Sequence, residues 1–147
     1  MIVNALFLTL VLNYYIINIM LTVTYLDLDA VSAIYKALGV EGEPLGANFV
    51  MYDGSAPVAL WRMNVLFEEK PIGNIDKIVF ADGVVEEDKL FFVHAMFFKL
   101  IDGAPLTLRV NGVHDSLKRF GFEEVGGNME VFSKNIDLHY MCSSKKY

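Results

Sequence analysis

A chain of 147 residues is the size of one domain and can bury roughly two thirds of the surface that it exposes when unfolded. Its 18 acidic and 12 basic side chains give a formal net charge of -6, which should repel polyanions and favour amines or basic segments, so we expect no nucleic-acid partner. The single cysteine, Cys142, excludes an intramolecular disulfide and a cysteine-based zinc cluster, and we expect a cytoplasmic protein without a metal.

The first 26 residues contain no charged side chain and are nearly long enough to span a bilayer, for which roughly 20 apolar residues suffice. Asparagines within this run, and the lack of a Lys or Arg before Lys36, argue against a membrane helix. From Met20 onward the sequence already predicts a strand and a helix. Three interpretations therefore stay open for residues 1–19: an extension upstream of a true start at Met20, a membrane anchor, or an additional packed element.

The rest of the chain alternates predicted strands and helices. The expected elements are a strand over 21–25, a helix capped by Asp27 or Asp29 and ended by Gly39, a hairpin of 48–52 and 58–67, a turn over 68–74, a strand over 75–81, a helix over 87–101, a strand over 105–110, a short helix closed by Gly121, and a terminal strand or pair of strands over 129–142. This order predicts an α/β (α+β) fold with a mixed sheet, in a single domain of residues 20–142 followed by a tail of residues 143–147.

The helix predicted over 87–101 is apolar nearly all round. A small sheet covers only one side of a helix, so its four phenylalanines, Phe91, Phe92, Phe97 and Phe98, indicate a second cover. An apolar ligand cavity and a partner subunit, such as the second copy in a homodimer, are the two interpretations, with an ordinary core as the alternative.

The segment "LTLRVNGVHDSLKRFGFEEVGGNMEVF" contains a strand, then Asn111, a short helix, "GFEEVG" and a methionine-containing final strand. Together with the order of elements, it resembles the GNAT superfamily of acyl-CoA N-acyltransferases over about residues 20–142. The resemblance implies a mostly antiparallel central sheet with helices on both faces. It also implies that backbone N–H groups after the strand over 75–81 hold the pyrophosphate of acetyl-CoA, with Asn111 near the pantetheine arm. The cofactor-binding positions are then Val84, Val85, Glu86, Glu87 and Asn111.

Two departures from the family pattern bear on the chemistry. The Arg and the two glycines of the usual loop are replaced by Val85, Asp88 and Leu90, and the tyrosine that protonates the leaving thiolate is replaced by Leu117. Glu86, Glu87 and Asp88 lie in or just before the first turn of the helix, so they can satisfy the helix terminus themselves and repel a diphosphate. The loop is therefore interpreted as degenerate.

Other polar residues are candidates for an acceptor site. Arg62 and Asn64 share one face of their strand and are the candidate substrate-binding residues, while Asp76 on the next strand is the candidate general base. A cross-strand ion pair between Arg62 and Asp76 is the alternative. Strand alternation places Asp76 on the face of Ile78. His114 is interpreted as part of the cap of the short helix.

Two functions follow from the sequence. The first is a GNAT-like domain with weakened or lost acetyl-CoA chemistry that binds a small ligand or a partner. The second is an acetyl-CoA-dependent N-acetyltransferase that acts on an amine through a non-standard loop. The acidic loop favours the first function, and the order of elements is compatible with either one.

Overall fold

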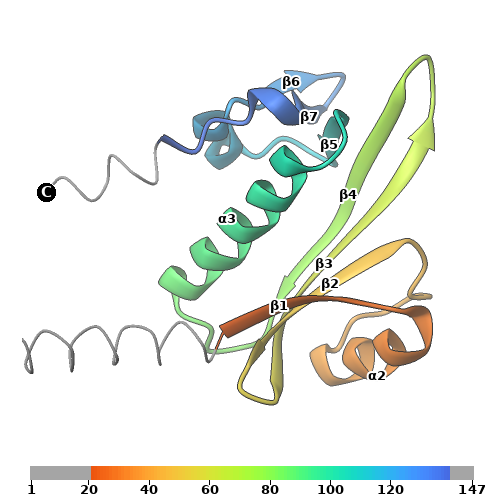
Figure 1. Ribbon diagram of the computed structural model, residues 1–147, viewed down its shortest axis with the longest axis vertical. Helices are drawn as coiled ribbons and strands as arrows, with labels where there is room; N and C mark the ends of the chain where they lie inside the picture. The colour runs from red at the N-terminus through yellow and green to blue at the C-terminus, as the bar shows by residue number, and fades with distance from the viewer. Residues whose placement is uncertain (1–20, 140–147) are drawn as a thin grey trace, which may run out of the picture.

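The computed structural model describes residues 21–139, which form seven strands, two α-helices and two 3-10 helices (Figure 1). In chain order the elements are β1 (Leu21–Leu26), α2 (Leu28–Leu38), β2 (Ala47–Asp53), β3 (Ala56–Phe67), β4 (Pro71–Phe80), α3 (Glu86–Asp102), β5 (Thr107–Val110), η1 (Asp115–Phe120), β6 (Glu123–Val125), β7 (Asn128–Phe132) and η2 (Ser133–Asn135). The expectations for residues 1–19, for Cys142 and for the tail lie outside these described residues.

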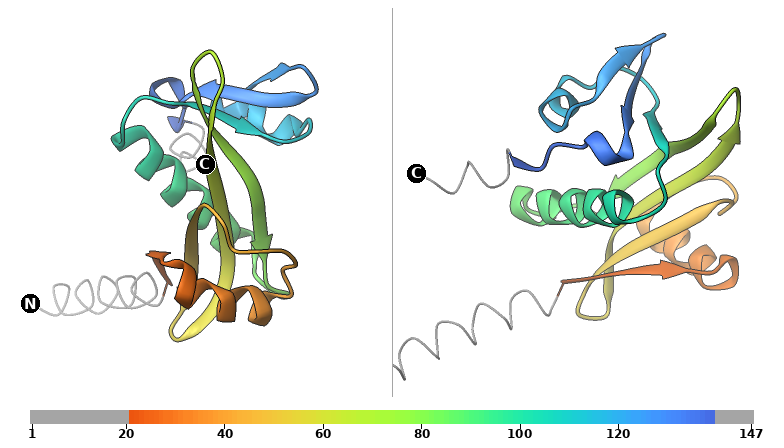
Figure 2. Two further views of the ribbon diagram at one scale, coloured as in Figure 1. Left: turned by 90° about the vertical axis from the view of Figure 1, so that its right-hand side faces the viewer. Right: turned by 45° about the horizontal axis from the view of Figure 1, so that its top comes forward.

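The strands form one sheet in the order β1-β2-β3-β4-β5-β7-β6. Neighbouring strands are antiparallel except β4 and β5, which are parallel because α3 crosses over between them. Helix α2 covers one face of the sheet and α3 covers the other (Figure 1, Figure 2). The predicted mixed, mostly antiparallel sheet with helices on both faces is confirmed.

Helix α2 begins and ends at the residues that its sequence predicts. Asp27 is the N-cap, and its carboxylate accepts a hydrogen bond from the Ala30 N–H at 3.0 Å. Gly39 takes the left-handed conformation, with φ of 67°, that glycine adopts without steric cost. Val31 and Tyr35 are buried against Val50 and the rest of a small core on this face. The helix is therefore fixed by local capping and by one apolar stripe.

Helix α3 supplies the larger core on the opposite face. Phe92, Met96 and Phe97 are buried, and the Trp61 ring lies 6.3 Å from the Phe92 ring and 5.8 Å from the Phe97 ring. Phe98 remains 64% exposed. A second cover for this side of the helix stays a prediction.

Three features differ from the sequence prediction. Residues 71–74 are part of β4 rather than a turn, because they pair with both β3 and β5 and this pairing outweighs the local Pro and Gly signals. Gly73 permits the close packing there, since a Cβ at this position would lie 2.6 Å from Leu106 Cδ2. Residues 123–125 form β6, where the sequence predicted only a helix end, and β7 ends at Phe132 instead of continuing.

Within residues 21–139, no helix has both the length and the apolar character that a membrane crossing requires.

Candidate functional site

Strands β4 and β5 separate part of the way along their shared edge. Their pairing runs from Ile72 opposite Thr107 to Ile75 opposite Val110. Beyond this point β4 continues to Phe80, whereas β5 ends at Val110. The two parallel strands therefore leave an opening in the sheet on the carboxyl side of their last pair, which is where ligands bind in many open parallel sheets.

A β-bulge lies at the start of this opening. Arg62 and Met63 are consecutive on β3, but their partners on β4 are Lys77 and Ile75, so Asp76 is the extra residue. A bulge bends its strand and increases the local twist. It therefore accounts for the departure of β4 from β5 directly after Ile75.

The bulge also changes which way Asp76 points. Ile78 packs in the core on the α3 side, whereas Asp76 accepts hydrogen bonds from Arg62, whose guanidinium also donates to Tyr35 Oη in the core on the α2 side. The prediction that Asp76 shares a face with Ile78 is wrong, because the extra residue shifts the alternation by one position.

A cavity of about 370 Å³ fills the opening between β4 and β5. Its volume is at the lower end of the range for small-molecule sites, which begins at roughly 300 Å³. Its apolar lining comes from Ile75, Ile78, Phe80, Val93, Val110 and Leu117, and its polar lining from Asp76, Lys77, Asn111, His114 and Ser116. The cavity can hold a slender, mainly apolar chain with polar groups at one side.

The predicted residue Asn111 does lie at this cavity, directly after β5. Its backbone carbonyl oxygen is 3.0 Å from His114 Nε2. His114 is the N-cap residue of η1, as predicted, although its side chain makes no capping hydrogen bond. The sequence missed His114 and Ser116 as cavity residues, and only the turn after β5 brings them there.

Leu117 also lines the cavity. The resemblance places a tyrosine at this position, and the structure places Leu117 in the lining of the cavity. A leucine has no proton to give to a leaving group. Any proton transfer in this cavity must come from another residue or from water.

The loop between β4 and α3 forms a second cavity of about 320 Å³. Val85 is the N-cap of α3, and its side chain has no acceptor for the backbone of the helix. The N–H groups of Glu86 and Glu87 belong to the first turn, so they have no carbonyl partner within the helix. Gly83 has φ of 83°, and no heavy atom lies within 4 Å of where its Cβ would be. This terminus has the backbone donors and partial positive charge that suit an anion.

The carboxylates around this loop fall into two groups. Asp53, Asp82 and Asp88 line the cavity itself. The side chain of Glu86 is 83% exposed and pairs with Lys89, whose Nζ is 3.2 Å from Glu86 Oε1. Glu86, Glu87 and Asp88 do lie in the first turn, but among the described residues none of their carboxylates accepts a hydrogen bond from its backbone, so self-filling of the terminus stays a prediction. The carboxylates that line the cavity are therefore all aspartates, two of which lie outside the helix.

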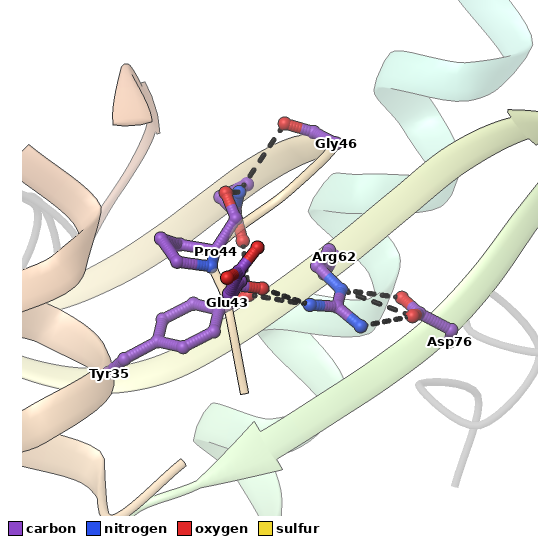
Figure 3. Close-up of polar contacts among 7 residues, drawn as sticks. Tyr35, Glu43, Pro44, Gly46, Arg62 and Asp76 are labelled. Atoms are coloured by element: carbon purple, nitrogen blue, oxygen red, sulfur yellow. Dashed lines mark hydrogen bonds and ion pairs between the residues drawn. The ribbon is translucent and has the colours of Figure 1, made fainter. Parts of the chain in front are cut away.

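Arg62 and Asp76 form an ion pair across β3 and β4 (Figure 3). Arg62 Nε donates to both carboxylate oxygens of Asp76, at 2.9 and 3.1 Å, and Arg62 Nη2 donates to Oδ2. The remaining donor, Nη1, reaches the carbonyl oxygen of Glu43 at 2.8 Å and Tyr35 Oη at 3.4 Å. Hydrogen bonding to Asp76 raises the pKa of Arg62 above its ordinary value. The guanidinium thus fixes the loop after α2 to the sheet.

This geometry bears on the predicted acceptor site. Arg62 forms the cross-strand ion pair with Asp76 that was the alternative to substrate binding, and both carboxylate oxygens of Asp76 accept hydrogen bonds from it. Asn64 lies against the loop, since a Cβ on Gly46 would be 2.0 Å from Asn64 Oδ1. The roles of Arg62, Asn64 and Asp76 in substrate binding and catalysis stay predictions. In residues 21–139, no group of three or more His, Cys, Asp and Glu side chains is placed to hold a metal ion.

No family model and no curated protein matches the sequence, but solved structures match the fold. A chain in the crystal structure of the KacTA–DNA complex superposes with a TM-score of 0.55 at 14% identity, covering 83% of this chain and 99% of that one. A mutant AtaT toxin bound to the C-terminus of the antitoxin AtaR gives a TM-score of 0.56 at 15% identity, covering 82% and 98%. The chain therefore shares the fold of these structures.

A third match is the AtaT mutant toxin bound to both the antitoxin C-terminus and acetyl-CoA, with a TM-score of 0.54 at 13% identity over 82% of this chain and 98% of that one. At these identities the likeness concerns the arrangement of strands and helices. What the site can do chemically therefore rests on the residues of this chain.

Proposed function

We propose that the protein is an acetyl-CoA-dependent N-acetyltransferase that acts on an amine. The observation that carries the proposal is the opening between β4 and β5, whose cavity of about 370 Å³ begins at the bulge and is lined by Asn111. A pantetheine arm is a slender chain of the kind that this cavity can hold. The backbone donors at the start of α3 are the candidate partners for the diphosphate.

The chain's charge supports an amine as the acceptor. The formal net charge is -6, and a negative field raises the local concentration of a cationic substrate. The same charge weakens the diphosphate site, because Asp53, Asp82 and Asp88 line the loop cavity. A carboxylate ~6 Å from a diphosphate in watery surroundings opposes binding by about 1 kcal/mol. Acetyl-CoA binding is therefore expected to be weakened by this loop but retained.

A second candidate function is a GNAT-fold domain that binds a small ligand or a protein partner without transferring an acyl group. Two observations favour it: the three aspartates of the loop cavity, and Leu117 in place of a proton donor. In this case the domain either binds a small ligand in the cavity between β4 and β5, or binds a protein partner such as a second copy of the chain.

Calorimetric titration of the full chain with acetyl-CoA separates the two functions. A dissociation constant on the order of micromolar supports the acetyltransferase, and one on the order of millimolar or weaker supports the second function. Replacing Asp88 with Asn should tighten binding roughly five-fold, which corresponds to about 1 kcal/mol. Glu86→Gln is the matched control, because Glu86 is exposed and paired with Lys89, and it should change the affinity less.

A further inference from the structure

The turn after β5 holds His114 in a defined position. Gly112 has φ of 82°, and its N–H donates to the side-chain oxygen of Asn128 on β7 at 3.1 Å. His114 Nε2 lies 3.0 Å from the Asn111 carbonyl oxygen. The turn is therefore tied to the neighbouring strand on one side and closed by the imidazole on the other.

This hydrogen bond determines which ring nitrogen is protonated. A carbonyl oxygen only accepts hydrogen bonds, so Nε2 of His114 must carry the hydrogen and donate it to Asn111. The other nitrogen, Nδ1, is then the one that can gain and lose a proton. A histidine held in one tautomer by a backbone carbonyl is the usual arrangement for a proton-transfer group.

The other polar residues of the cavity suit this task less well. The Asp76 carboxylate is held by Arg62, and Asn111 does not titrate. Ser116 and Lys77 supply a hydroxyl and an ammonium, whereas imidazole is the side-chain type best suited to proton transfer near neutral pH. Leu117, at the position that the GNAT resemblance gives to a proton donor, offers none.

We propose that His114 is the proton donor to the leaving group in this cavity, with Asn111 as the residue that positions it. The inference rests on the proposed acetyltransferase function and adds to it a residue at a different position from that of the family's tyrosine. In the reaction, the amine nitrogen forms a C–N bond to the acetyl carbon, the C–S bond breaks, the sulfur keeps the electron pair, and the nitrogen loses one proton. The doubly protonated ring of His114 gives the proton on Nδ1 to the sulfur and becomes neutral, while the Nε2–H stays hydrogen-bonded to the Asn111 carbonyl oxygen. Nδ1 then regains a proton from solvent, which receives the one that the amine releases.

The test uses the full chain and needs no knowledge of the natural acceptor. Nitrogen NMR of the histidine rings reports the tautomer, and addition of CoA reports which ring lies at the bound molecule. Release of CoA from acetyl-CoA is then measured with hydroxylamine as the amine probe, together with acetyl-CoA affinity by calorimetry. The variants are His114→Ala, His114→Gln and His114→Ala combined with Leu117→Tyr. His94→Ala is the matched control, because His94 lies on α3 at a different cavity.

The expected result has four parts. The His114 ring carries its hydrogen on Nε2 and its resonances shift with CoA, while those of His94 do not. At saturating acetyl-CoA, His114→Ala and His114→Gln transfer at least about 10²-fold more slowly, the usual contribution of a general acid, and this loss exceeds any change in their affinity for acetyl-CoA. His94→Ala transfers normally. Leu117→Tyr restores part of the rate to His114→Ala, since a phenol then faces the same cavity.

Three results would overturn the inference, and they are distinguishable. If His114→Ala or His114→Gln transfers at the normal rate, His114 is at most a structural residue and the proposed function stands. If the protein binds acetyl-CoA but transfers nothing to hydroxylamine, the proton-transfer role is wrong and the second candidate function is favoured. If acetyl-CoA does not bind at all, the proposed function fails and the inference fails with it.

Discussion

Replacing Asp76 with Asn should reveal what the ion pair with Arg62 does. The two side chains are only 13% and 18% exposed, and the guanidinium donates to both carboxylate oxygens. Removing the charge leaves an amide oxygen that still accepts one hydrogen bond, but the half-buried guanidinium loses its counter-ion. Hydrogen bonds to charged groups contribute roughly 1.5–3 kcal/mol each, so we expect the free energy of unfolding to fall by about 2 kcal/mol.

The assay is urea denaturation of the full chain, followed by circular dichroism, with acetyl-CoA affinity measured in parallel. Asp76→Ala should cost more than Asp76→Asn, because no acceptor remains for the guanidinium. Glu68→Gln is the matched control: Glu68 also pairs with an arginine, Arg109, but its side chain is 50% exposed, so solvent screens the pair and little stability should be lost.

An Asp76→Asn variant with unchanged stability would refute this reasoning. If the same variant kept its stability and its acetyl-CoA affinity but lost acyl transfer, the predicted role of Asp76 as general base would gain support instead. The two readouts therefore separate a structural carboxylate from a catalytic one at the same position.

Two further predictions concern the packing of the core and the loss of stability at low pH. Phe97→Ala should lower the free energy of unfolding by about 3–5 kcal/mol, because Phe97 is 1% exposed and its ring contacts core aromatics. Phe98 is 64% exposed, so Phe98→Ala should change the free energy of unfolding little in the same thermal or urea denaturation. Hydrogen bonding to Arg109 lowers the pKa of Glu68 in the folded protein. The pair therefore stabilises the fold above the unfolded pKa of about 4.3, and this contribution is lost as the pH falls through the folded pKa. Carbon NMR titration should show the lowered pKa, and Arg109→Gln should return it toward the ordinary value.

Local sequence signals predicted the elements whose ends are set by their own residues. The cap at Asp27 and the left-handed Gly39 fix α2, and the Asp-Gly pair at residues 53–54 fixes the turn of the β2–β3 hairpin. The prediction of α3 was close, because its apolar run is long and a Gly-Ala-Pro segment follows it. These features depend on interactions within a few residues of each other, and the sequence displays them directly.

The elements that were misplaced depend on partners far along the chain. The first residues of β4 look like a turn, and become a strand only because β3 and β5 flank them. Strand β6 has three residues and all of them are exposed, so no apolar pattern marks it, and it exists through pairing with β7. Tertiary pairing outweighed local preference in both cases.

For the site, the sequence alone determined the order of elements, the acidic loop before α3, Asn111 after β5 and the leucine at position 117. Only the tertiary structure decided how they act together. A bulge that inserts one residue into β4 has no local sequence signal, yet it separates β4 from β5, points Asp76 toward Arg62 and leaves the cavity that Asn111 lines. His114 lines the same cavity because its turn is held by Asn128, which lies 16 positions from its hydrogen-bond partner Gly112. Contacts of this kind depend on the whole sheet rather than on neighbouring residues.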